Sequence, residues 1–186
     1  MHDRTHRRAR AALVATSLLL VSGAQACHMS MRGERRASAT MFDAAGRQLG
    51  VVTLTEAEAN RGVVIAARLQ GLAAGEHGMH FHTVGTCDAG AAFASAGGHF
   101  NPSARKHGLE NPTGPHAGDL PNFTVSEDGM GTFRETTSRV TLAAGAGSLL
   151  DADGSAIVIH ATSDDQRTDP AGNSGARIAC GVVKER

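Results

Sequence analysis

The sequence predicts an all-β protein of eight short strands, arranged as a β-barrel or a sandwich and carrying two long loops. Three observations support this fold class. Strand-like segments rich in β-branched residues alternate with turn signals along much of the chain. No long segment repeats its apolar residues at the helical spacing. The 23 glycines suit a protein with many turns.

The first 26 residues have the layout of a secretory signal peptide and are not expected to belong to the fold. Residues 1–10 are basic, residues 11–21 are almost wholly apolar, and Ala24-Gln25-Ala26 resembles a cleavage site. The apolar run is too short to span a membrane. A buried N-terminal helix is the alternative. The signal peptide predicts export to the periplasm of a bacterial envelope.

Cys27 directly follows the expected cleavage site, and two interpretations of it remain open. Cleavage before a cysteine is typical of a lipoprotein, in which an acylated Cys27 would tether the protein to the membrane. Ala24, however, stands where a larger aliphatic residue is usual. Ordinary cleavage, which leaves Cys27 as a spare thiol, is therefore the second interpretation.

Residues 27–38 are expected to form a flexible linker, and residues 39–186 a single domain with a core of its own. The linker contains His28, Met29 and Met31, which are soft enough to bind copper weakly, but a plain tether is the preferred interpretation. The signal peptide carries four arginines and one aspartate, so its net charge is +3. Because the whole chain is formally neutral, the mature part carries about −3. This charge argues against nucleic acid as a partner.

The first half of the domain contains four strand-like segments. A turn signal at Ala45-Gly46 separates the first two, which are expected to form a hairpin, and a polar turn precedes the third. The segments are residues 39–44, 49–55, 63–72 and 75–84.

The second half begins with a long loop. Residues 85–118 follow neither the strand nor the helix period, and a loop of this length in a compact domain is expected to be functional. Four strands follow. Glu127-Asp128-Gly129 is a strong turn signal between the first two, and residues 162–175 form the second polar loop. These strands are residues 120–126, 131–142, 156–161 and 176–183.

Histidines are unusually dense in the domain, and their positions predict two metal sites. His80 and His82 are two residues apart on one strand, so they share a face. With His160 they would form a site of imidazoles only, which suits copper. The long loop contributes His99, His107 and His116, and Asp119 follows within a tight turn. Three histidines and one aspartate suit a closed structural zinc site.

Cys87 and Cys180 remain as a pair if Cys27 is acylated, and an oxidising compartment permits a disulfide between them. Two unpaired buried thiols are the alternative.

Four motifs together resemble the copper–zinc superoxide dismutase family, of the bacterial secreted or periplasmic type. They are Gly78–His82, Ala96–Pro102, His116–Asp119 and Gly172–Val182, and the resemblance spans roughly residues 38–184. The resemblance implies an eight-stranded antiparallel Greek-key β-barrel. It also implies dismutation of superoxide to molecular oxygen and hydrogen peroxide by a redox-active copper, bridged through a histidine to a structural zinc. One copper and one zinc per chain are expected, and the expected role is antioxidant defence in the bacterial envelope.

The resemblance also implies a role for each matching residue. Copper is expected on His80, His82, His99 and His160, and zinc on His99, His107, His116 and Asp119. Catalysis is expected from His99, as the bridging ligand that carries a proton, and from Arg177, which attracts the superoxide anion. Asp164 is expected to orient a ligand of each metal, His77 to be structural, and Cys87 and Cys180 to form a disulfide.

Two departures from the family pattern are visible. Thr83 stands where an acidic residue often follows the second copper histidine, and Cys87 lies only five residues after His82. Neither removes a ligand. A non-enzymatic copper- and zinc-binding module of the same fold is the alternative function, and the sequence does not decide between a monomer and a homodimer.

Overall fold

The computed structural model describes residues 33–56 and 62–186. The predicted signal peptide, Cys27 and His28, Met29 and Met31 of the linker lie outside the described residues. Among the residues that are described, no helix is long and apolar enough to cross a membrane. The described chain is almost entirely strand and loop, with only two short 3-10 turns, η1 (Ala89–Ala91) and η2 (Ala94–Ala96). The predicted all-β class is confirmed.

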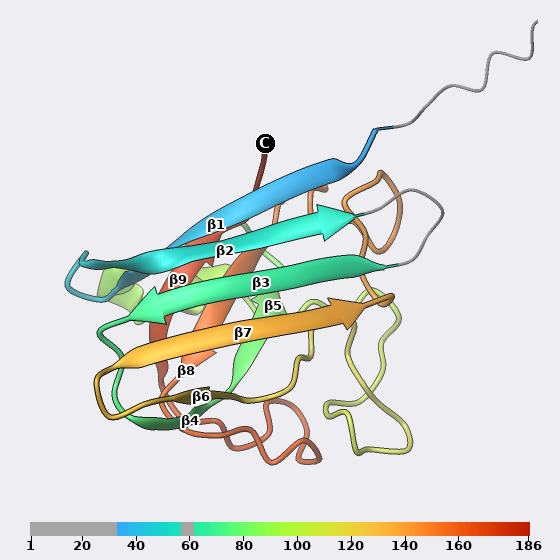
Figure 1. Cartoon of the computed structure of the whole chain (residues 1–186). Coiled ribbons are helices and arrows are strands. Elements are labelled where there is room, and N and C mark those ends of the chain that lie inside the picture. The colour runs from blue at the N-terminus through green and yellow to red at the C-terminus, as the bar shows by residue number, and fades with distance from the viewer. Residues whose placement is uncertain (1–32, 57–61) are drawn as a thin grey trace, which may run out of the picture. The chain divides into compact units, whose positions relative to one another are not determined.

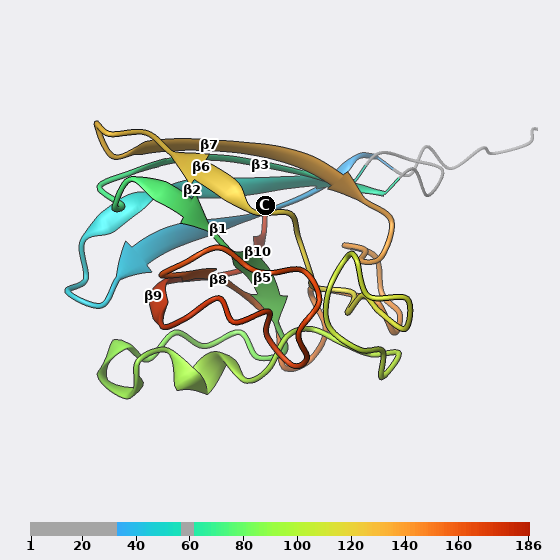
Figure 2. The same cartoon turned by 90° about the horizontal axis from the view of Figure 1, so that it is seen from below.

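Ten strands form one antiparallel sheet that nearly closes into a barrel (Figures 1 and 2). Their order in the sheet is β4-β6-β7-β3-β2-β1-β9-β8-β5, and β10 adds to β1. The bounds are β1 Arg35–Asp43, β2 Gln48–Glu56, β3 Val63–Gln70, β4 Gly75–His77, β5 Met79–His82, β6 Phe123–Val125, β7 Met130–Thr137, β8 Ala156–His160, β9 Arg177–Val182 and β10 Lys184–Glu185.

The strand count differs from the predicted eight for two reasons. The predicted strand 75–84 is divided at Gly78 into β4 and β5, and the two-residue β10 was not predicted. In addition, β1 begins at Arg35, four residues before the predicted start. Residues 35–38 were expected in the linker, but they pair with residues 53–56 of β2 and so belong to the sheet.

The stretch Gly75–His82 closes the barrel. Its first half, β4, pairs with β6 at one edge of the sheet, and its second half, β5, pairs with β8 at the other edge. At the break, the backbone of Gly78 accepts a hydrogen bond from the amide of His160, the last residue of β8, and donates one to the carbonyl of Thr162, just after β8. A side chain at Gly78 would press on Ser174 and Asp164, at 3.2 and 3.3 Å from their Cβ atoms. Glycine therefore lets the chain cross from one edge to the other.

Alternation along the strands separates two apolar clusters. Met79 and Phe81 of β5, with Ile157 and Ile159 of β8, face the main core inside the barrel. The intervening residues of β8, Ala156 and Val158, face a second cluster on the other side of the sheet, where they pack with Phe93, Ala96 and Cys180. The second cluster attaches the loop that contains η1 and η2 to the outside of β8 and β9 (Figure 2).

Candidate metal centre

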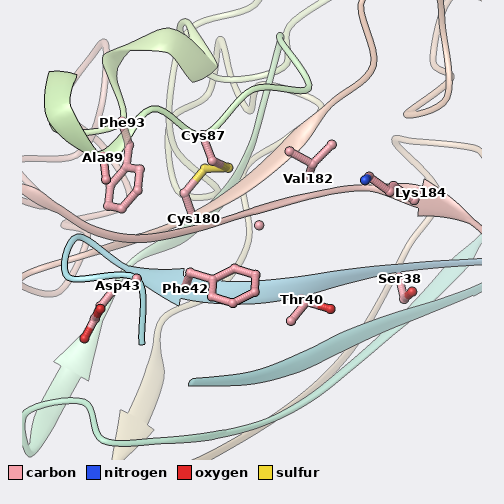
Figure 3. Close-up of a pocket in the computed structure, with 12 residues that line it drawn as sticks. Ser38, Thr40, Phe42, Asp43, Cys87, Ala89, Phe93, Cys180, Val182 and Lys184 are labelled. Carbon is pink, nitrogen blue, oxygen red and sulfur yellow. A yellow bond between two sulfur atoms is a disulfide. The ribbon is translucent and has the colours of Figure 1, made fainter. Parts of the chain in front are cut away.

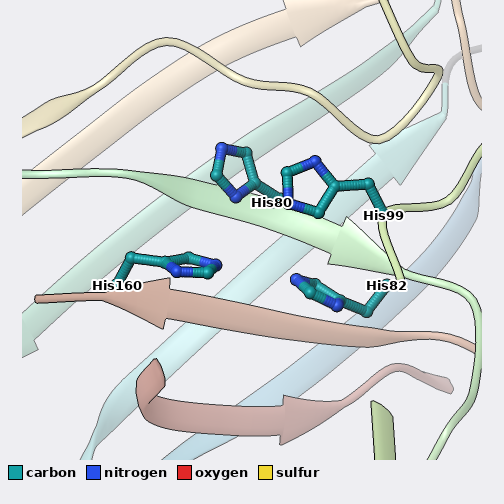
Figure 4. Close-up of side chains that lie close together, drawn as sticks. All are labelled: His80, His82, His99 and His160. Carbon is teal, nitrogen blue, oxygen red and sulfur yellow. The ribbon is translucent and has the colours of Figure 1, made fainter. Parts of the chain in front are cut away.

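Four buried histidines converge on one point next to the strand that closes the barrel. His80 and His82 come from β5, His160 ends β8, and His99 comes from the long loop, where it pairs with His82 through an isolated bridge (Figure 4). One ring nitrogen of each lies within 4.8 Å of those of the other three. This set unites the residues predicted to bind copper.

The same four rings each have one buried nitrogen without a hydrogen-bond partner: His80 Nδ1, His82 Nε2, His99 Nε2 and His160 Nε2. Leaving a buried polar atom unpaired costs about 1–3 kcal/mol, so four together at one point require an explanation. Four imidazole nitrogens that share a point have the donor chemistry of a transition-metal site. The residues present therefore fit a bound copper ion.

The opposite nitrogen of each ring is held by the surrounding structure. His80 Nε2 lies 2.6 Å from Asp164 Oδ2, and His99 Nδ1 lies 2.9 Å from Asp119 Oδ1. His82 Nδ1 lies 2.9 Å from the carbonyl of Gly97, and His160 Nδ1 lies 3.2 Å from that of Gly175. Partners of this kind fix the orientation of a ligating imidazole.

Burial keeps most of these rings neutral. It lowers the pKa of His80 to about 3 and that of His160 to about 4, and it also lowers the pKa of His82 well below its ordinary value. At neutral pH the unpartnered nitrogens of these rings therefore offer lone pairs to a cation.

A second set shares His99 with the first and unites the residues predicted to bind zinc. Asp119 Oδ1 lies 2.9 Å from His99 Nδ1, 3.1 Å from His107 Nδ1 and 3.3 Å from His116 Nδ1. Asp119 Oδ2 accepts hydrogen bonds from the amides of Gly108 and His116. All four side chains are buried. Three imidazoles and one carboxylate are typical of a closed tetrahedral zinc site.

Charge in the second set is divided between His107 and two carboxylates. Burial alone would lower the pKa of His107, but hydrogen bonds to Asp119 and Asp164 outweigh it and raise the pKa to about 9. Burial would raise the pKa of Asp119, yet the bonds from His107 and His99 hold it well below its usual range. A cation bound among these groups would take the place of the proton on His107.

Asp164 connects the two sets through hydrogen bonds. Besides its contact with His80, its Oδ1 lies 3.0 Å from His107 Nε2. Its main chain exchanges two hydrogen bonds of 2.8 Å with the side chain of Asn122. Behind it, Gly172 approaches so closely that a Cβ there would lie 1.8 Å from Asp164 Oδ1. His80, His107 and Asp164 also have nitrogen and oxygen atoms close enough together to hold a metal ion. In this group, however, both ring nitrogens are hydrogen-bonded to the carboxylate of Asp164.

Arg177, at the start of β9, lies beside the first set. It donates from Nη1 to the carbonyl of Phe93 at 2.8 Å and from Nη2 to that of Gly97 at 2.7 Å. The Gly97 carbonyl also holds His82, so the guanidinium and the ring share an anchor. Burial lowers the pKa of Arg177 from an ordinary value of 12.5, yet arginine remains charged in proteins.

The disulfide between Cys87 and Cys180 is confirmed, with an S–S distance of 2.03 Å. It joins the loop of η1 and η2 to β9 and lies at the edge of a hollow of about 460 Å³ (Figure 3). Phe42, Phe93 and Val182 are among the lining residues, and none of the predicted metal ligands is. The hollow is therefore separate from the histidine sets.

His77 lies next to the sets but in neither. Its Nδ1 lies 2.7 Å from the carbonyl of His160 and its Nε2 lies 2.9 Å from that of Ala73. Both ring nitrogens are thus occupied by backbone, which suits the structural role that the resemblance implied.

Sequence reasoning missed three residues that hold the sets in place. Asn122 and Gly172 support Asp164, and Arg139 donates from Nη2 to the carbonyl of Asp119 at 2.6 Å. No pattern along the chain marks them, because their partners lie on distant segments. Gly172 was noted only as the first residue of a motif.

Comparison with known proteins identifies relatives of the whole domain. The family model described as copper/zinc superoxide dismutase matches residues 48–183. A protein named superoxide dismutase (Cu-Zn) from Caulobacter vibrioides is 46% identical over 142 residues, which are 75% of this chain and 80% of that protein. Superoxide dismutase (Cu-Zn) 2 from Aquifex aeolicus is 41% identical over 174 residues, 92% of this chain and 96% of that protein.

Among solved structures, a double mutant of a superoxide-dismutase-like protein from Bacillus subtilis is similar to this chain. The TM-score is 0.73 and the identity 38%, over 78% of this chain and 95% of that one. In that double mutant, histidine replaces one tyrosine and one proline. The similarity supports the same barrel fold for this chain.

Proposed function

Because the chain belongs to the copper/zinc superoxide dismutase family, we propose that it removes superoxide in the bacterial envelope. It is an oxidoreductase that dismutates the superoxide anion to molecular oxygen and hydrogen peroxide, with one copper and one zinc per chain. The observation that carries the assignment is the convergence of four unpartnered buried imidazole nitrogens next to a second set that shares His99.

The proposed division of ligands follows the two sets. Copper would be held by His80, His82, His99 and His160, through the nitrogens that have no other partner. Zinc would be held by His99, His107, His116 and Asp119. His99 belongs to both sets, so it would serve both metals. This arrangement leaves Asp164 to orient His80 in one site and His107 in the other.

When bound, copper supplies the one-electron chemistry of the dismutation, and zinc supplies charge without redox chemistry. The chain positions substrate and protons around it. His99 would carry the proton on Nε2 whenever that nitrogen is not bound to copper, and would pass it to the peroxide product. Arg177 attracts the substrate anion, and its two carbonyl partners fix the direction of the guanidinium.

The test is metal analysis combined with a superoxide-consumption assay. One copper and one zinc per chain, with rapid turnover, would support the assignment. Zinc alone without turnover would instead favour the non-enzymatic metal-binding module. This second function is retained as the alternative because one similar protein is described only as superoxide-dismutase-like. Against it stands the complete set of six histidines, Asp119 and Arg177 in this chain.

Arg177→Ala is expected to lower kcat/KM about tenfold at low salt, which corresponds to about 1.4 kcal/mol, without loss of copper. Attraction of superoxide by a local field is known for this family, and here it has to overcome a mature chain with a net charge of about −3. The matched control is Arg167→Ala. The charge of Arg167 is already paired, because its Nε donates to Glu110 Oε2 at 2.8 Å. Stopped-flow rates at two ionic strengths would show the difference, and equal rates for wild type and Arg177→Ala at low salt would contradict it.

Zinc binding to the metal-free protein is expected to tighten about tenfold per pH unit below about pH 9, for one displaced proton. The reason is that the folded pKa of His107, about 9, lies above its ordinary value of 6.5. The ring therefore holds a proton at neutral pH, and zinc must displace it. Calorimetry in two buffers of different ionisation enthalpy would count the released protons. Asp164→Asn removes one carboxylate that raises the pKa of His107, so the pH dependence should end at a lower pH than in the wild type. A pH-independent affinity in the wild type would refute the assignment.

Location in the periplasm is proposed from the N-terminal sequence pattern and from the disulfide, which an oxidising compartment favours. A membrane tether through a lipidated Cys27 is proposed as the anchored form. Mass spectrometry of the mature N-terminus tests both, because an unmodified Cys27 or His28 terminus excludes the lipid. The homodimer stays a prediction that sedimentation would test.

A further inference from the structure

We propose that Phe93 is a positioning residue for Arg177. Its buried ring holds a strained turn of the loop, and the carbonyl of that same residue directs the guanidinium. The contacts of Phe93 do not depend on the proposed function, whereas the predicted effect on kcat/KM rests on it.

Backbone carbonyls alone position Arg177. Among the residues that the structure describes, no carboxylate forms a salt bridge with it, and its hydrogen bonds go to the carbonyls of Phe93 and Gly97. Neutral acceptors fix the direction of the guanidinium and leave its charge uncompensated, which suits the attraction of an anion. The orientation of the Arg177 guanidinium therefore depends on the backbone at these two positions.

The backbone at Phe93 is strained. Phe93 has φ 59° and ψ 18°, and the preceding Ala92 has φ 48° and ψ 40°, so two consecutive residues other than glycine adopt the left-handed conformation. Each is unfavourable relative to ordinary backbone, because the Cβ atom comes too close to the following carbonyl oxygen. Such residues persist only where the surrounding structure holds them. The turn itself is closed by hydrogen bonds from the amide of Phe93 to Asp88 and from that of Ala92 to Ala89.

Packing of the Phe93 ring keeps the strained turn in place. Its relative exposure is 2%, and it packs in the second apolar cluster with Ala96, Ala156, Val158 and Cys180. Figure 3 shows it beside Ala89 at one end of the hollow, near the disulfide. The disulfide fastens the loop at position 87, and the ring fastens it again at the residue that accepts from Arg177. Burial of the ring is favourable and offsets the cost of the strained turn.

The mechanism predicts that removing the ring lets the turn relax and moves the carbonyl away from Arg177. Three variants separate ring from backbone. Phe93→Ala loses the ring and keeps the backbone cost, Phe93→Gly loses both, and Phe93→Leu keeps an apolar anchor. We expect Phe93→Ala to lose about five- to tenfold in kcat/KM at low salt with unchanged copper and zinc content. Phe93→Gly should lose less than Phe93→Ala, because glycine adopts the left-handed conformation without cost, and the leucine variant should stay within about twofold.

A double-mutant cycle distinguishes positioning from a general structural effect. In an Arg177→Ala background, Phe93→Ala should cause no further loss of rate, because the group it positions is gone. An equal loss in both backgrounds would overturn the proposal.

A second measurement does not depend on activity. In the metal-free protein, the side-chain ¹H–¹⁵N signal of Arg177, identified by its absence in Arg177→Lys, should exchange with water faster in Phe93→Ala than in Phe93→Leu and wild type. Unchanged exchange would also overturn the proposal. If the loaded wild type showed no dismutase activity, the proposed function would fail, and this measurement would still decide whether Phe93 positions Arg177.

Discussion

Gly172→Ala is expected to weaken zinc binding by about 10–100-fold and to lower the free energy of unfolding by about 3 kcal/mol or more. A methyl group at this position would lie 1.8 Å from Asp164 Oδ1 and 2.6 Å from His107 Nε2, so Asp164 must move away from the ring. The backbone also has φ +61°, which costs an alanine about 1–2 kcal/mol. The collision and the backbone cost act together on the carboxylate that connects the two metal sites.

The matched control is Gly46→Ala. Gly46 has φ +79°, but a Cβ there would meet nothing within 4 Å. This variant is therefore destabilised only by the unfavourable backbone conformation. Competition with a chelator would measure zinc affinity in both variants, and chemical denaturation would measure stability. If Gly172→Ala bound zinc as tightly as Gly46→Ala, the proposed role of the Asp164–His107 contact would be wrong.

Removing the disulfide is the other change with a large expected effect. The two cysteines are 93 residues apart, and cross-linking a loop of this length contributes about 4–5 kcal/mol in the chain-entropy model. The double variant Cys87→Ser/Cys180→Ser should lose about that much free energy of unfolding. Because the same loop supplies both acceptors of Arg177, kcat/KM should also fall.

The experiment is best made in a Cys27→Ser background, which prevents mispairing of the third cysteine and serves as its own reference. Urea unfolding would give the stability, and hydrogen exchange over residues 85–97 would show whether the loop opens locally. Stability within about 1 kcal/mol of the reference would contradict the expected contribution.

The sequence predicted those parts of the site that depend on local geometry. The two-residue spacing placed His80 and His82 on one face of a strand, and the structure places Met79 and Phe81 on the opposite face, in the main core. The density of histidines indicated His99 and His160, and the resemblance to the family added the bridging role of His99 and the role of Asp164, which no local period could have connected. The disulfide was predicted by the same combination and is confirmed.

What could not be predicted depends on contacts between distant segments. The break at Gly78 exists because the two halves of one stretch pair with opposite edges of the sheet, and a period-2 pattern continues smoothly through it. Asn122, Arg139 and Phe93 support the site through bonds to residues 20–84 positions away.

The division of one stretch between both edges of the sheet has a consequence for the order of folding. Glu76 pairs with Thr124, so the first half can be placed only after residue 124 has been made. Met79 pairs with Ile159, so the second half must wait until the chain is almost complete. Contacts so distant in sequence carry a high entropic cost and form late. The strands β1, β2 and β3, which pair with their neighbours along the chain, can form first. We therefore expect the copper ligands to come together in the last folding step, so that an unfinished chain offers the metal no competent site.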